Sequence, residues 1–459
     1  MFKKDTIAAI STGMVQSGIG IVRMSGEEAL EILSRIYRSP SGHKDIRQVP
    51  THTLHYGYIY DGETLIDEVM VAIMRGPRSY TTEDVVEIDC HGGMIVMKKL
   101  LETVVKYGAR PAEPGELTKR AFLNGRIDLS QAEAVIDVIN SKNTMALSSS
   151  LGQLRGGMKK KIAGLRHEIL GNVAAIEAAM DDPEHFEDSH FSDALGGRVS
   201  AYLDEIEALL QSADSGRMVS EGIRTAIVGK PNAGKSSLMN ALLGEERAIV
   251  TEIEGTTRDT LEELMNLHGI PLKIIDTAGI RDTEDIVEKI GVRKAVSAVN
   301  EADLVIYVAD GSRALDDNDR AIMEMIRDKR AIVLLNKSDL ERQLTVADLE
   351  SMVHAPILEI SAREQTGLEA VEKMIREMFF SGRIDYNDEV LITNARHKAA
   401  LEAARESLRM VEDSIREHMP EDFYSIDLMD AYESLGLITG ETVGEDLADR
   451  IFSEFCMGK

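Results

Sequence analysis

Four short motifs contain the side chains of this sequence that are best suited to chemistry. They are residues 229–236 (Gly-Lys-Pro-Asn-Ala-Gly-Lys-Ser), 255–259 (Gly-Thr-Thr-Arg-Asp), 276–279 (Asp-Thr-Ala-Gly) and 336–339 (Asn-Lys-Ser-Asp). Between them they offer groups that suit the phosphates, the Mg²⁺ ion and the base of a nucleoside triphosphate. Their order along one chain predicts that the protein binds GTP with Mg²⁺ and hydrolyses it.

The first three motifs predict contacts to phosphate and metal. The glycines of residues 229–236 let backbone N–H groups turn toward the β-phosphate, and the helix that follows adds positive potential at its N-terminus. We expect Lys235 to reach the β- and γ-phosphates, and Ser236 and Thr257 to bind Mg²⁺. Asp276 is expected to hold a Mg²⁺-bound water. The nucleotide contacts predicted from these motifs are Asn232, Ala233, Gly234, Lys235, Ser236, Ser237, Gly255, Thr256, Thr257, Asp276, Thr277, Ala278 and Gly279.

The last motif predicts which base is bound. The carboxylate of Asp339 can accept hydrogen bonds from the N1–H and the exocyclic amine of guanine, and adenine does not present both donors in that arrangement. A site built around such donors rejects a base that lacks them by about 10⁴-fold. The further contacts expected around the base are Asn336, Lys337, Ser361, Ala362 and Arg363.

The group that positions the attacking water is not where Ras-like enzymes carry it. Those enzymes have a glutamine directly after the Asp-x-x-Gly motif, whereas this chain has Ile280. An isoleucine side chain cannot orient a water molecule, and the sequence shows no obvious arginine finger. The catalytic group must therefore lie elsewhere, and Glu288 lies in the acidic segment that follows the motif.

The elements that must position these motifs are readable from apolar runs. Residues 225–228, 272–275, 331–335 and 357–360 resemble buried strands, and each precedes one of the motifs or the Ser361 segment. Residues 237–243 have a helical pattern directly after the phosphate-binding loop, which is the strand–loop–helix context that this motif needs. Strands that alternate with helices predict an α/β domain with a largely parallel sheet over residues 219–381.

Length and composition limit the class of protein. The 459 residues suggest about three domains. With 43% hydrophobic and 29% charged residues, the chain has the composition of a globular protein. The formal charge of −27 gives no support to nonspecific nucleic-acid binding. The acidity is uneven, because residues 1–120 are close to neutral and residues 381–459 are strongly acidic. Any RNA contact would therefore use the first segment, the lysine run at 159–161, or a partner protein.

The two cysteines and the apolar pattern bear on the cellular compartment. Cys90 and Cys456 are too few for a disulfide framework or a metal set, which favours a reducing cytosol. The sequence shows no signal peptide and no apolar run of about 18 residues. We therefore expect a cytoplasmic protein without a membrane span.

The remaining segments predict a multidomain chain. Residues 1–118 alternate short strands and helices, and Pro111, Pro114 and Gly115 mark a boundary. Helical periodicity covers residues 119–218 and resumes over 382–459. The predicted fold class is therefore multidomain α/β plus all-α, in which a P-loop GTPase domain at 219–381 is inserted into a helical bundle. If both halves form one bundle, the two ends of the inserted domain lie close together.

The segments that flank the nucleotide motifs resemble a known family. The whole chain resembles the tRNA modification GTPases of the MnmE family, which is also called TrmE. The residues that carry the resemblance outside the nucleotide motifs are 23–26 (Arg-Met-Ser-Gly), 83–87, 91–93 (His-Gly-Gly), 114–116, 120–125 and the Cys-x-Gly-Lys end of 451–459.

The resemblance implies a function. Members of this family act with a flavin-dependent partner, MnmG, in a heterotetramer, and modify C5 of the wobble uridine (position 34) of certain tRNAs to the aminomethyl or carboxymethylaminomethyl form. Their N-terminal domain forms a homodimer and binds a 5-formyl- or methylene-tetrahydrofolate derivative. The family's folate contacts correspond to Arg23, Glu87, Arg126 and Lys459. Many relatives have lysine in place of Arg126, and an arginine fork differs from a lysine point charge.

The resemblance also implies a K⁺ ion at the phosphates. Similar enzymes bind it through the asparagine of the phosphate-binding loop, here Asn232, and through a switch segment that corresponds to Thr251, Ile253 and Thr256. The residues 251–254 (Thr251, Glu252, Ile253 and Glu254) are implied nucleotide contacts for the same reason. K⁺ would supply the charge of an arginine finger, which contributes about 10³–10⁵ in rate, and would drive dimerisation of two GTPase domains.

Two catalytic residues and two alternative functions complete the interpretation. The family's water-positioning glutamate corresponds to Glu288, and Cys456 is implied in tRNA modification, although its chemical role does not follow from the sequence. The chain could instead be a ribosome-assembly or regulatory switch GTPase with the same nucleotide domain. A third alternative is a folate-binding scaffold in which GTP turnover is incidental.

Overall fold

The computed structural model describes residues 5–42, 45–181, 191–243, 263–267, 269–275, 297–380, 391–453, 455 and 458. The chain forms two compact units. The first contains residues 1–136, 153–171 and 432–459, and the second contains residues 137–152 and 172–431.

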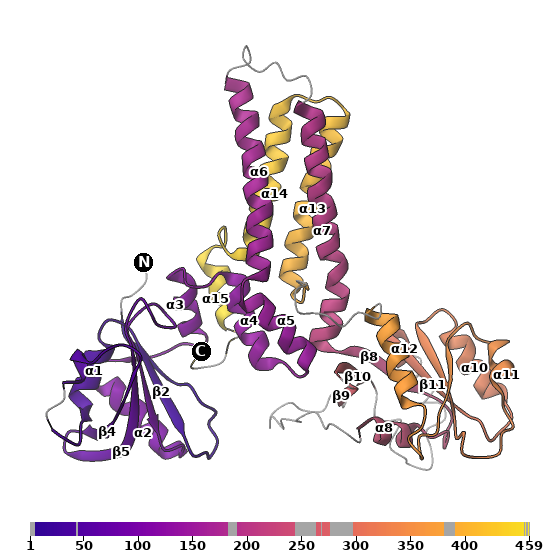
Figure 1. The fold of residues 1–459 in the computed structure, drawn as a ribbon, viewed down its shortest axis with the longest axis horizontal. Coiled ribbons are helices and arrows are strands. Elements are labelled where there is room, and N and C mark those ends of the chain that lie inside the picture. Colours follow the sequence, from indigo (N-terminus) through magenta and orange to yellow (C-terminus); the bar gives the residue numbers. More distant parts are fainter. Residues whose placement is uncertain are drawn as a thin grey trace. The chain divides into compact units, whose positions relative to one another are not determined.

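An α/β domain occupies the N-terminal part of the first unit (Figure 1). Among the described residues, seven strands form one sheet in the order β3-β4-β5-β6-β2-β1-β7. Neighbouring strands are antiparallel except β1 and β7, which are parallel. The strands are β1 (Ile7–Ile10), β2 (Gly20–Ser25), β3 (Tyr37–Arg38), β4 (Thr53–Asp61), β5 (Thr64–Met74), β6 (Val85–Cys90) and β7 (Arg110–Pro111).

Two helices cover one face of this sheet. They are α1 (Ala29–Ile36) and α2 (Met94–Lys106), and a short 3-10 helix, η1 (Ile46–Gln48), packs beside α1. Alternate residues of the strands point toward these helices, as the period of a strand requires. Val22, Val71 and Ile88 are fully buried there, while their neighbours Arg23 and Glu87 point to the opposite face. The opposite face therefore carries Arg23 and Glu87, together with apolar side chains such as Leu54 and Tyr56.

Helices complete the first unit beyond the sheet. A small apolar core joins α3 (Glu116–Leu123) and α4 (Leu129–Asn140) to α15 (Glu445–Ser453) near the end of the chain. Phe122 and Phe452 lie in this core with ring centroids 6.0 Å apart. Segments distant in sequence therefore share one core. This unit also includes the beginning of α6 (Gly157–Asp181) and the end of α14 (Glu421–Thr439).

The second unit contains a second α/β domain (Figure 1). Six described strands form a sheet in the order β13-β12-β11-β8-β10-β9, in which only β9 and β10 are antiparallel. The strands are β8 (Ile223–Val228), β9 (Glu263–Leu267), β10 (Ile270–Ile275), β11 (Leu304–Asp310), β12 (Ala331–Asn336) and β13 (Ile357–Glu359).

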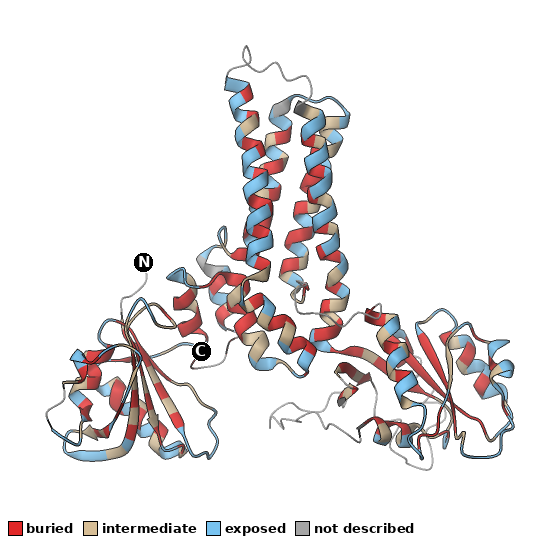
Figure 2. Cartoon of the chain, in the orientation of Figure 1, coloured by how far each residue is buried: buried red, intermediate tan, exposed pale blue. Residues whose placement is uncertain are grey.

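Helices cover both faces of this sheet. One core contains residues of α8 (Lys235–Leu243) and α12 (Leu368–Phe380), and the other contains residues of α10 (Asp317–Ile326) and α11 (Val346–Glu350). The central strands β11 and β12 are buried along their whole length (Figure 2). A largely parallel sheet covered on both faces is the doubly wound arrangement that the sequence predicts.

Long helices form the rest of the second unit. Helix α7 (Phe191–Glu221) packs along α13 (Ala395–Arg416) (Figure 1). Helix α5 (Thr144–Leu154) contributes Met145 and Ala146 to the core that also contains β8 and β10. Within the described residues, no helix combines the length and the apolar character needed to cross a bilayer.

The chain leaves α7 and returns to α13 at nearly the same place. The Ile392 N–H donates to the Ser212 Oγ at 3.2 Å. A Cβ on Gly216 would lie 2.2 Å from the Ile392 carbonyl oxygen, so only glycine allows this approach. The described segments that flank the predicted inserted domain therefore lie close together. The domain boundaries given above stay a prediction.

Candidate functional site

The phosphate-binding loop follows β8 and leads into α8, as its motif requires. Gly229 and Gly234 have positive φ angles of 154° and 102°, and Asn232 has a φ of 61°. A side chain on Gly234 would collide with the amide of Asn336, because an added Cβ would lie 2.1 Å from its Nδ2. The glycine at this position is therefore required by the residue that ends β12.

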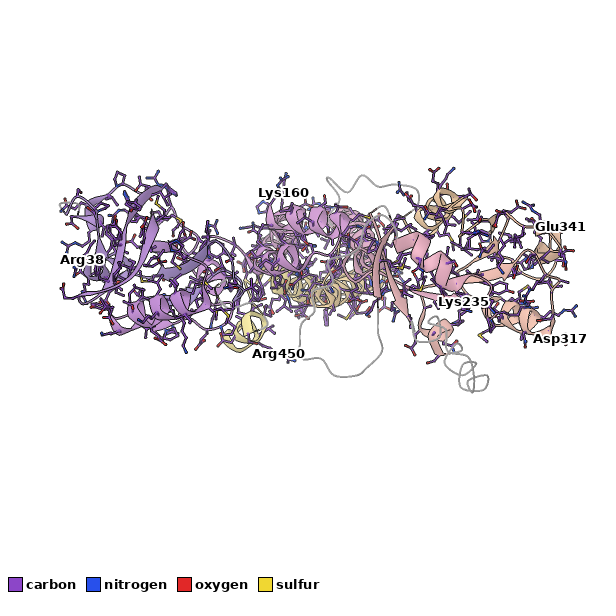
Figure 3. All side chains as sticks on the ribbon, turned by 90° about the horizontal axis from the view of Figure 1, so that it is seen from below. Arg38, Lys160, Lys235, Asp317, Glu341 and Arg450 are labelled. Carbon is purple, nitrogen blue, oxygen red and sulfur yellow. The ribbon has the colours of Figure 1, made fainter. Side chains whose placement is uncertain are left out.

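Lys235 is the first residue of α8 (Figure 3). Its Nζ donates to the carbonyl oxygens of Gly229 and Lys230 at 2.7 and 2.8 Å. The ammonium group thus lies directly over the backbone of the loop, from which a phosphate bound by the loop is within reach. Ser236 follows it in the first turn of the helix, where a hydroxyl is well placed for a phosphate-bound cation.

Asn336 joins the phosphate-binding loop to the segment expected to support the base. It is the last residue of β12 and only 2% exposed. Its Nδ2 donates to the Ala233 carbonyl at 2.8 Å, and its Oδ1 accepts from the Ala362 N–H at 3.0 Å. The two segments, more than 100 residues apart in sequence, are therefore held by one amide.

Asp339 is held in a defined orientation by the Ser361 hydroxyl. The Ser361 Oγ donates to its Oδ1 at 2.6 Å, and the Glu364 N–H donates to the same hydroxyl at 3.1 Å. The hydrogen bond from Ser361 lowers the pKa of Asp339 below its usual value, and even an unperturbed aspartate, with a pKa of about 4, is ionised at neutral pH. A carboxylate has about four acceptor positions, and it can still accept two N–H donors of a base. The structure thus brings Asn336, Asp339, Ser361 and Ala362 together.

Asp310 is a further residue of this site that the sequence analysis did not identify. It ends β11 beside Asn336 of β12, and the Lys337 Nζ donates to its Oδ2 at 2.7 Å. Burial raises the pKa of Asp310, but the hydrogen bonds from Lys337 and Ser312 outweigh it and leave the pKa below its usual value. Its position at the carboxyl end of a parallel strand is a sequence signal that could have found it.

Arg363, which was predicted to lie near the base, is exposed and paired with Glu364 at 3.8 Å.

Several predicted residues lie outside the described residues. They are Thr251, Glu252, Ile253, Glu254, Gly255, Thr256, Thr257, Asp276, Thr277, Ala278, Gly279, Glu288, Cys456 and Lys459. Their roles stay predictions.

The N-terminal domain brings Arg23 and Glu87 together on the sheet face that α1 and α2 leave open. The two residues are register partners on β2 and β6, and the Arg23 Nε donates to the Glu87 Oε1 at 2.7 Å. Both side chains are partly buried, at 16% and 22% exposure. The Gly458 carbonyl accepts from the Ser11 hydroxyl at 3.1 Å and from Arg23 at 3.4 Å. The C-terminal segment therefore reaches the same pair.

Arg126 lies over a tyrosine that the sequence analysis missed. Its guanidinium carbon is 4.9 Å from the centre of the Tyr80 ring, and its Nη1 donates to the Tyr80 carbonyl at 3.2 Å. The Tyr80 hydroxyl is 2.9 Å from the Thr118 hydroxyl. Burial raises the pKa of Tyr80, and the charges of both Arg126 and Arg23 act against that rise. Tyr80 thus lies within electrostatic range of two predicted folate contacts, and its sequence surroundings carried no signal for this.

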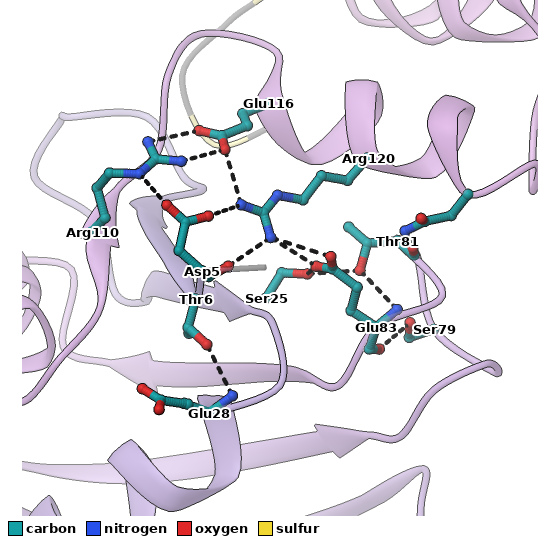
Figure 4. Close-up of polar contacts among 11 residues, drawn as sticks. Asp5, Thr6, Ser25, Glu28, Ser79, Thr81, Glu83, Arg110, Glu116 and Arg120 are labelled. Atoms are coloured by element: carbon teal, nitrogen blue, oxygen red, sulfur yellow. Dashed lines mark hydrogen bonds and ion pairs between the residues drawn. The ribbon is translucent and has the colours of Figure 1, made fainter. Parts of the chain in front are cut away.

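A network of charged residues fixes α3 against the sheet beside this site (Figure 4). The side chain of Arg120 in α3 is only 5% exposed. It donates to the Asp5 Oδ1 at 2.7 Å, to both Glu83 carboxylate oxygens at 3.2 Å and to the Glu116 Oε1 at 3.1 Å. Arg110 binds the Asp5 and Glu116 carboxylates from the other side. The network therefore compensates every one of these carboxylates.

Comparison with known proteins assigns the chain to a family. Residues 129–456 match the MnmE helical domain, and residues 6–126 match the N-terminus of the GTP-binding protein TrmE. The chain is 57% identical to a tRNA modification GTPase MnmE of Lachnoclostridium phytofermentans over 457 residues, with 100% of each chain covered. The chain belongs to the MnmE family of tRNA modification GTPases. The predicted family and fold class are confirmed.

Other MnmE proteins are similarly close over their whole length. Those of Alkaliphilus metalliredigens and Clostridioides difficile are both 49% identical, over 462 and 460 residues, with 100% of each chain covered. Among solved structures, the G domain of the FeoB iron transporter of T. maritima is 25% identical and covers 33% of this chain and 96% of its own, with a TM-score of 0.26.

Proposed function

We propose the reaction in which this tRNA modification GTPase takes part. With a flavin-dependent partner of the MnmG type, it modifies C5 of the wobble uridine, at position 34, to the aminomethyl or carboxymethylaminomethyl form. The two proteins form a heterotetramer in the cytoplasm, built on a homodimer of this chain. The observation that carries the proposal is the full-length match to MnmE proteins, at 57% identity for one of them.

The geometry around Asn336 and Asp339 supports GTP as the nucleotide. A carboxylate oriented by Ser361 and held ionised is the acceptor that the N1–H and the exocyclic amine of guanine require. Asn336 ties this segment to the phosphate-binding loop, so the base and the phosphates are held at a fixed separation. Lys235 then binds the phosphates, and Ser236 binds Mg²⁺. Thr257 and Asp276 complete the proposed Mg²⁺ site.

The proposed reaction is tested by nucleoside mass spectrometry of tRNA from cells that lack this chain. We expect the C5-substituted wobble uridine to disappear, and to return when the wild-type chain is supplied but not when an Asp276→Ala variant is supplied. Wobble uridines that do not change on deletion would contradict the proposal. That result would favour the alternative of a ribosome-assembly or regulatory switch GTPase.

K⁺ is proposed to take the place of an arginine finger, with Glu288 positioning the water. The ligands of the K⁺ ion would be Asn232, Thr251, Ile253 and Thr256. Asn232 is exposed and has a left-handed φ of 61°, which asparagine tolerates better than most residues. We expect GTP hydrolysis to be faster by about 10-fold or more in K⁺ than in Na⁺ at the same ionic strength, since charge at this position contributes about 10³–10⁵ in rate elsewhere. Steady-state phosphate release measures it, and equal rates in the two salts would exclude the K⁺ site.

The open sheet face of the N-terminal domain suits a tetrahydrofolate derivative. Glu87 offers a carboxylate for the N–H donors of a pterin, Arg23 holds that carboxylate in place, and Arg126 offers a cation for the glutamate tail. Tyr80 adds an aromatic surface beside Arg126. When bound, the folate supplies a one-carbon unit. We propose that Arg23, Glu87, Arg126 and Lys459 hold it, and that Cys456 takes part in the modification.

A further inference from the structure

One stretch of the chain has a charge opposite to that of the whole. Residues 138–167 contain six lysines and arginines and no aspartate or glutamate. In a chain with 79 acidic residues among 459, a random stretch of this length would hold about five. The part of this stretch that belongs to the first unit contains Arg155 and the consecutive lysines 159–161. A local positive surface therefore exists in a protein of formal charge −27.

The three lysines lie at the exposed beginning of α6. Met158, Ile162 and Leu165 form the buried face of this helix. Lys159, Lys160 and Lys161 are exposed, and Lys160 projects into solvent (Figure 3). None of the three forms an ion pair or a hydrogen bond through its side chain with any described residue. Their charges are therefore not used within the part of the chain that the structure describes.

The position of these charges is unfavourable for the helix itself. The first turn of a helix prefers acidic side chains, because its backbone N–H groups carry partial positive charge. The first turn of α6 contains no acidic residue and has lysines in place of them. Gly164 and Gly171 follow on the exposed side of the same helix, and nothing lies within 4 Å of a Cβ added at either position. A glycine inside a helix costs about 1 kcal/mol relative to alanine, and the described residues offer no packing reason for these two.

Hydrogen bonds hold the backbone that carries these charges. Gln131 of α4 donates from its Nε2 to the Leu154 carbonyl at 2.9 Å, and the Gly156 N–H donates to the Gln153 carbonyl at 2.8 Å. The turn between α5 and α6 is thus hydrogen-bonded on both sides. Arg155 and the lysines are presented from this turn and the first helical turn after it.

We propose that Arg155, Lys159, Lys160 and Lys161 form a docking surface for the phosphate backbone of tRNA. Unpaired cations in a stretch of sequence that lacks carboxylates complement a chain of phosphates, and contacts of this kind position an RNA without reading its sequence. Gly164 and Gly171 have no side chain beyond the backbone, so that a ribose-phosphate strand can approach the helix closely at these positions. The inference rests on the proposed function for the identity of the RNA. What is new is the location of the RNA contact on this chain.

The test is binding of fluorescently labelled tRNA to the full-length chain, measured by anisotropy over a range of KCl concentrations. We expect a variant with Lys159, Lys160 and Lys161 changed to glutamine to bind about 10- to 100-fold more weakly near 100 mM salt. The slope of log affinity against log salt should flatten by about one unit for each phosphate that the variant no longer neutralises. GTP hydrolysis without tRNA should not change. The corresponding arginine variant, which keeps the charge, should bind like the wild type.

A matched control removes the same charge elsewhere. Lys98 and Lys99 in α2 and Lys373 in α12 are also exposed, and their change to glutamine should alter affinity less than about 2-fold. Equal affinity and slope for the wild type and the Lys159–161 variant would overturn the inference, as would the absence of tRNA binding by the wild type at low salt. In cells, a normal level of wobble-uridine modification with the glutamine variant would count against the docking surface alone. Whether the modification is lost when the whole chain is deleted tests the proposed function separately.

Discussion

Changing Asp339 to asparagine is expected to weaken GTP binding by about 10³- to 10⁴-fold. The carboxylate is oriented by Ser361 at 2.6 Å and is the acceptor proposed for both ring donors of guanine. An amide replaces one acceptor with a donor, which would face the exocyclic amine and leave a polar group without a partner. Xanthine carries an oxygen where guanine carries that amine, so XTP should bind the variant better than GTP does. Titration with fluorescent guanine and xanthine nucleotides measures both changes.

A second aspartate in the same domain provides the control. Asp348 also accepts from a hydroxyl, that of Thr345 at 2.6 Å, at the beginning of α11. Asp348 is the third residue of a capping box and accepts from the Thr345 N–H, which the oxygen of an asparagine can also do, so Asp348→Asn should leave nucleotide affinity and specificity unchanged. GTP affinity that survives in Asp339→Asn would show that Asp339 does not contact the base.

Changing Arg120 to methionine is expected to destabilise the protein by about 3–5 kcal/mol. Arginine at this position neutralises Asp5, Glu83 and Glu116, and its side chain is 5% exposed. Methionine fills a similar volume but leaves these carboxylates partly buried with fewer partners, and removal of one member of a buried ion pair has about this effect. Urea unfolding followed by circular dichroism measures the change in the free energy of unfolding.

The control and the pH dependence identify the cause. Arg38 pairs with Glu63 at 3.2 Å, but these side chains are 49% and 93% exposed, so Arg38→Met should cost less than about 1 kcal/mol.

The hydrogen bond from Arg110 lowers the pKa of Asp5 in the folded protein. Burial raises the pKa of Glu116, but hydrogen bonds led by that from Arg110 outweigh it and leave the pKa lowered.

The sign of the pH dependence follows from the lowered pKa values of Asp5 and Glu116. Lowered folded pKa values contribute stability above the unfolded values of about 4, and that contribution is lost as the pH falls through the folded values. The difference in stability between Arg120→Met and the wild type should therefore shrink below about pH 4. A difference that is equal at about pH 3 and about pH 7 would point to packing instead.

The elements that carry clear periodicity were predictable. Strands β8, β10 and β12 and helix α8 lie within a few residues of the positions expected from the apolar runs and the helical pattern. Strand β4 was not predicted, because its pattern is inverted. Its inward residues include His55 and Gly57, whereas Leu54 and Tyr56 are exposed, at 55% and 44%. Alternation identifies a strand, but it predicts the buried face only where that face is the apolar one.

The nucleotide site was more predictable than the site on the N-terminal sheet. Its motifs are contiguous, so residue type and spacing identify Lys235, Asn336 and Asp339 without knowledge of the fold. Arg23 and Glu87 are 64 residues apart, and their pairing depends on the register of β2 and β6. Tyr80 and Arg120 act through contacts between an α/β domain and a helix, which single-sequence patterns do not encode. The resemblance to a family supplied Arg23 and Glu87, and the register of the sheet explains why they meet.

The contact between Gly216 and Ile392 makes the inserted domain a closed loop with respect to α7 and α13. For α7 and α13, everything between these residues is a loop whose two ends are already joined. The entropy of such a loop depends only weakly on its length, by about 0.6 kcal/mol for each doubling. A change in the length of the inserted domain would therefore cost the α7–α13 pair little loop entropy. Met145, Ala146, Met218 and Val219 nevertheless pack into the core of the inserted domain, so the helices and that domain stay coupled through side-chain contacts.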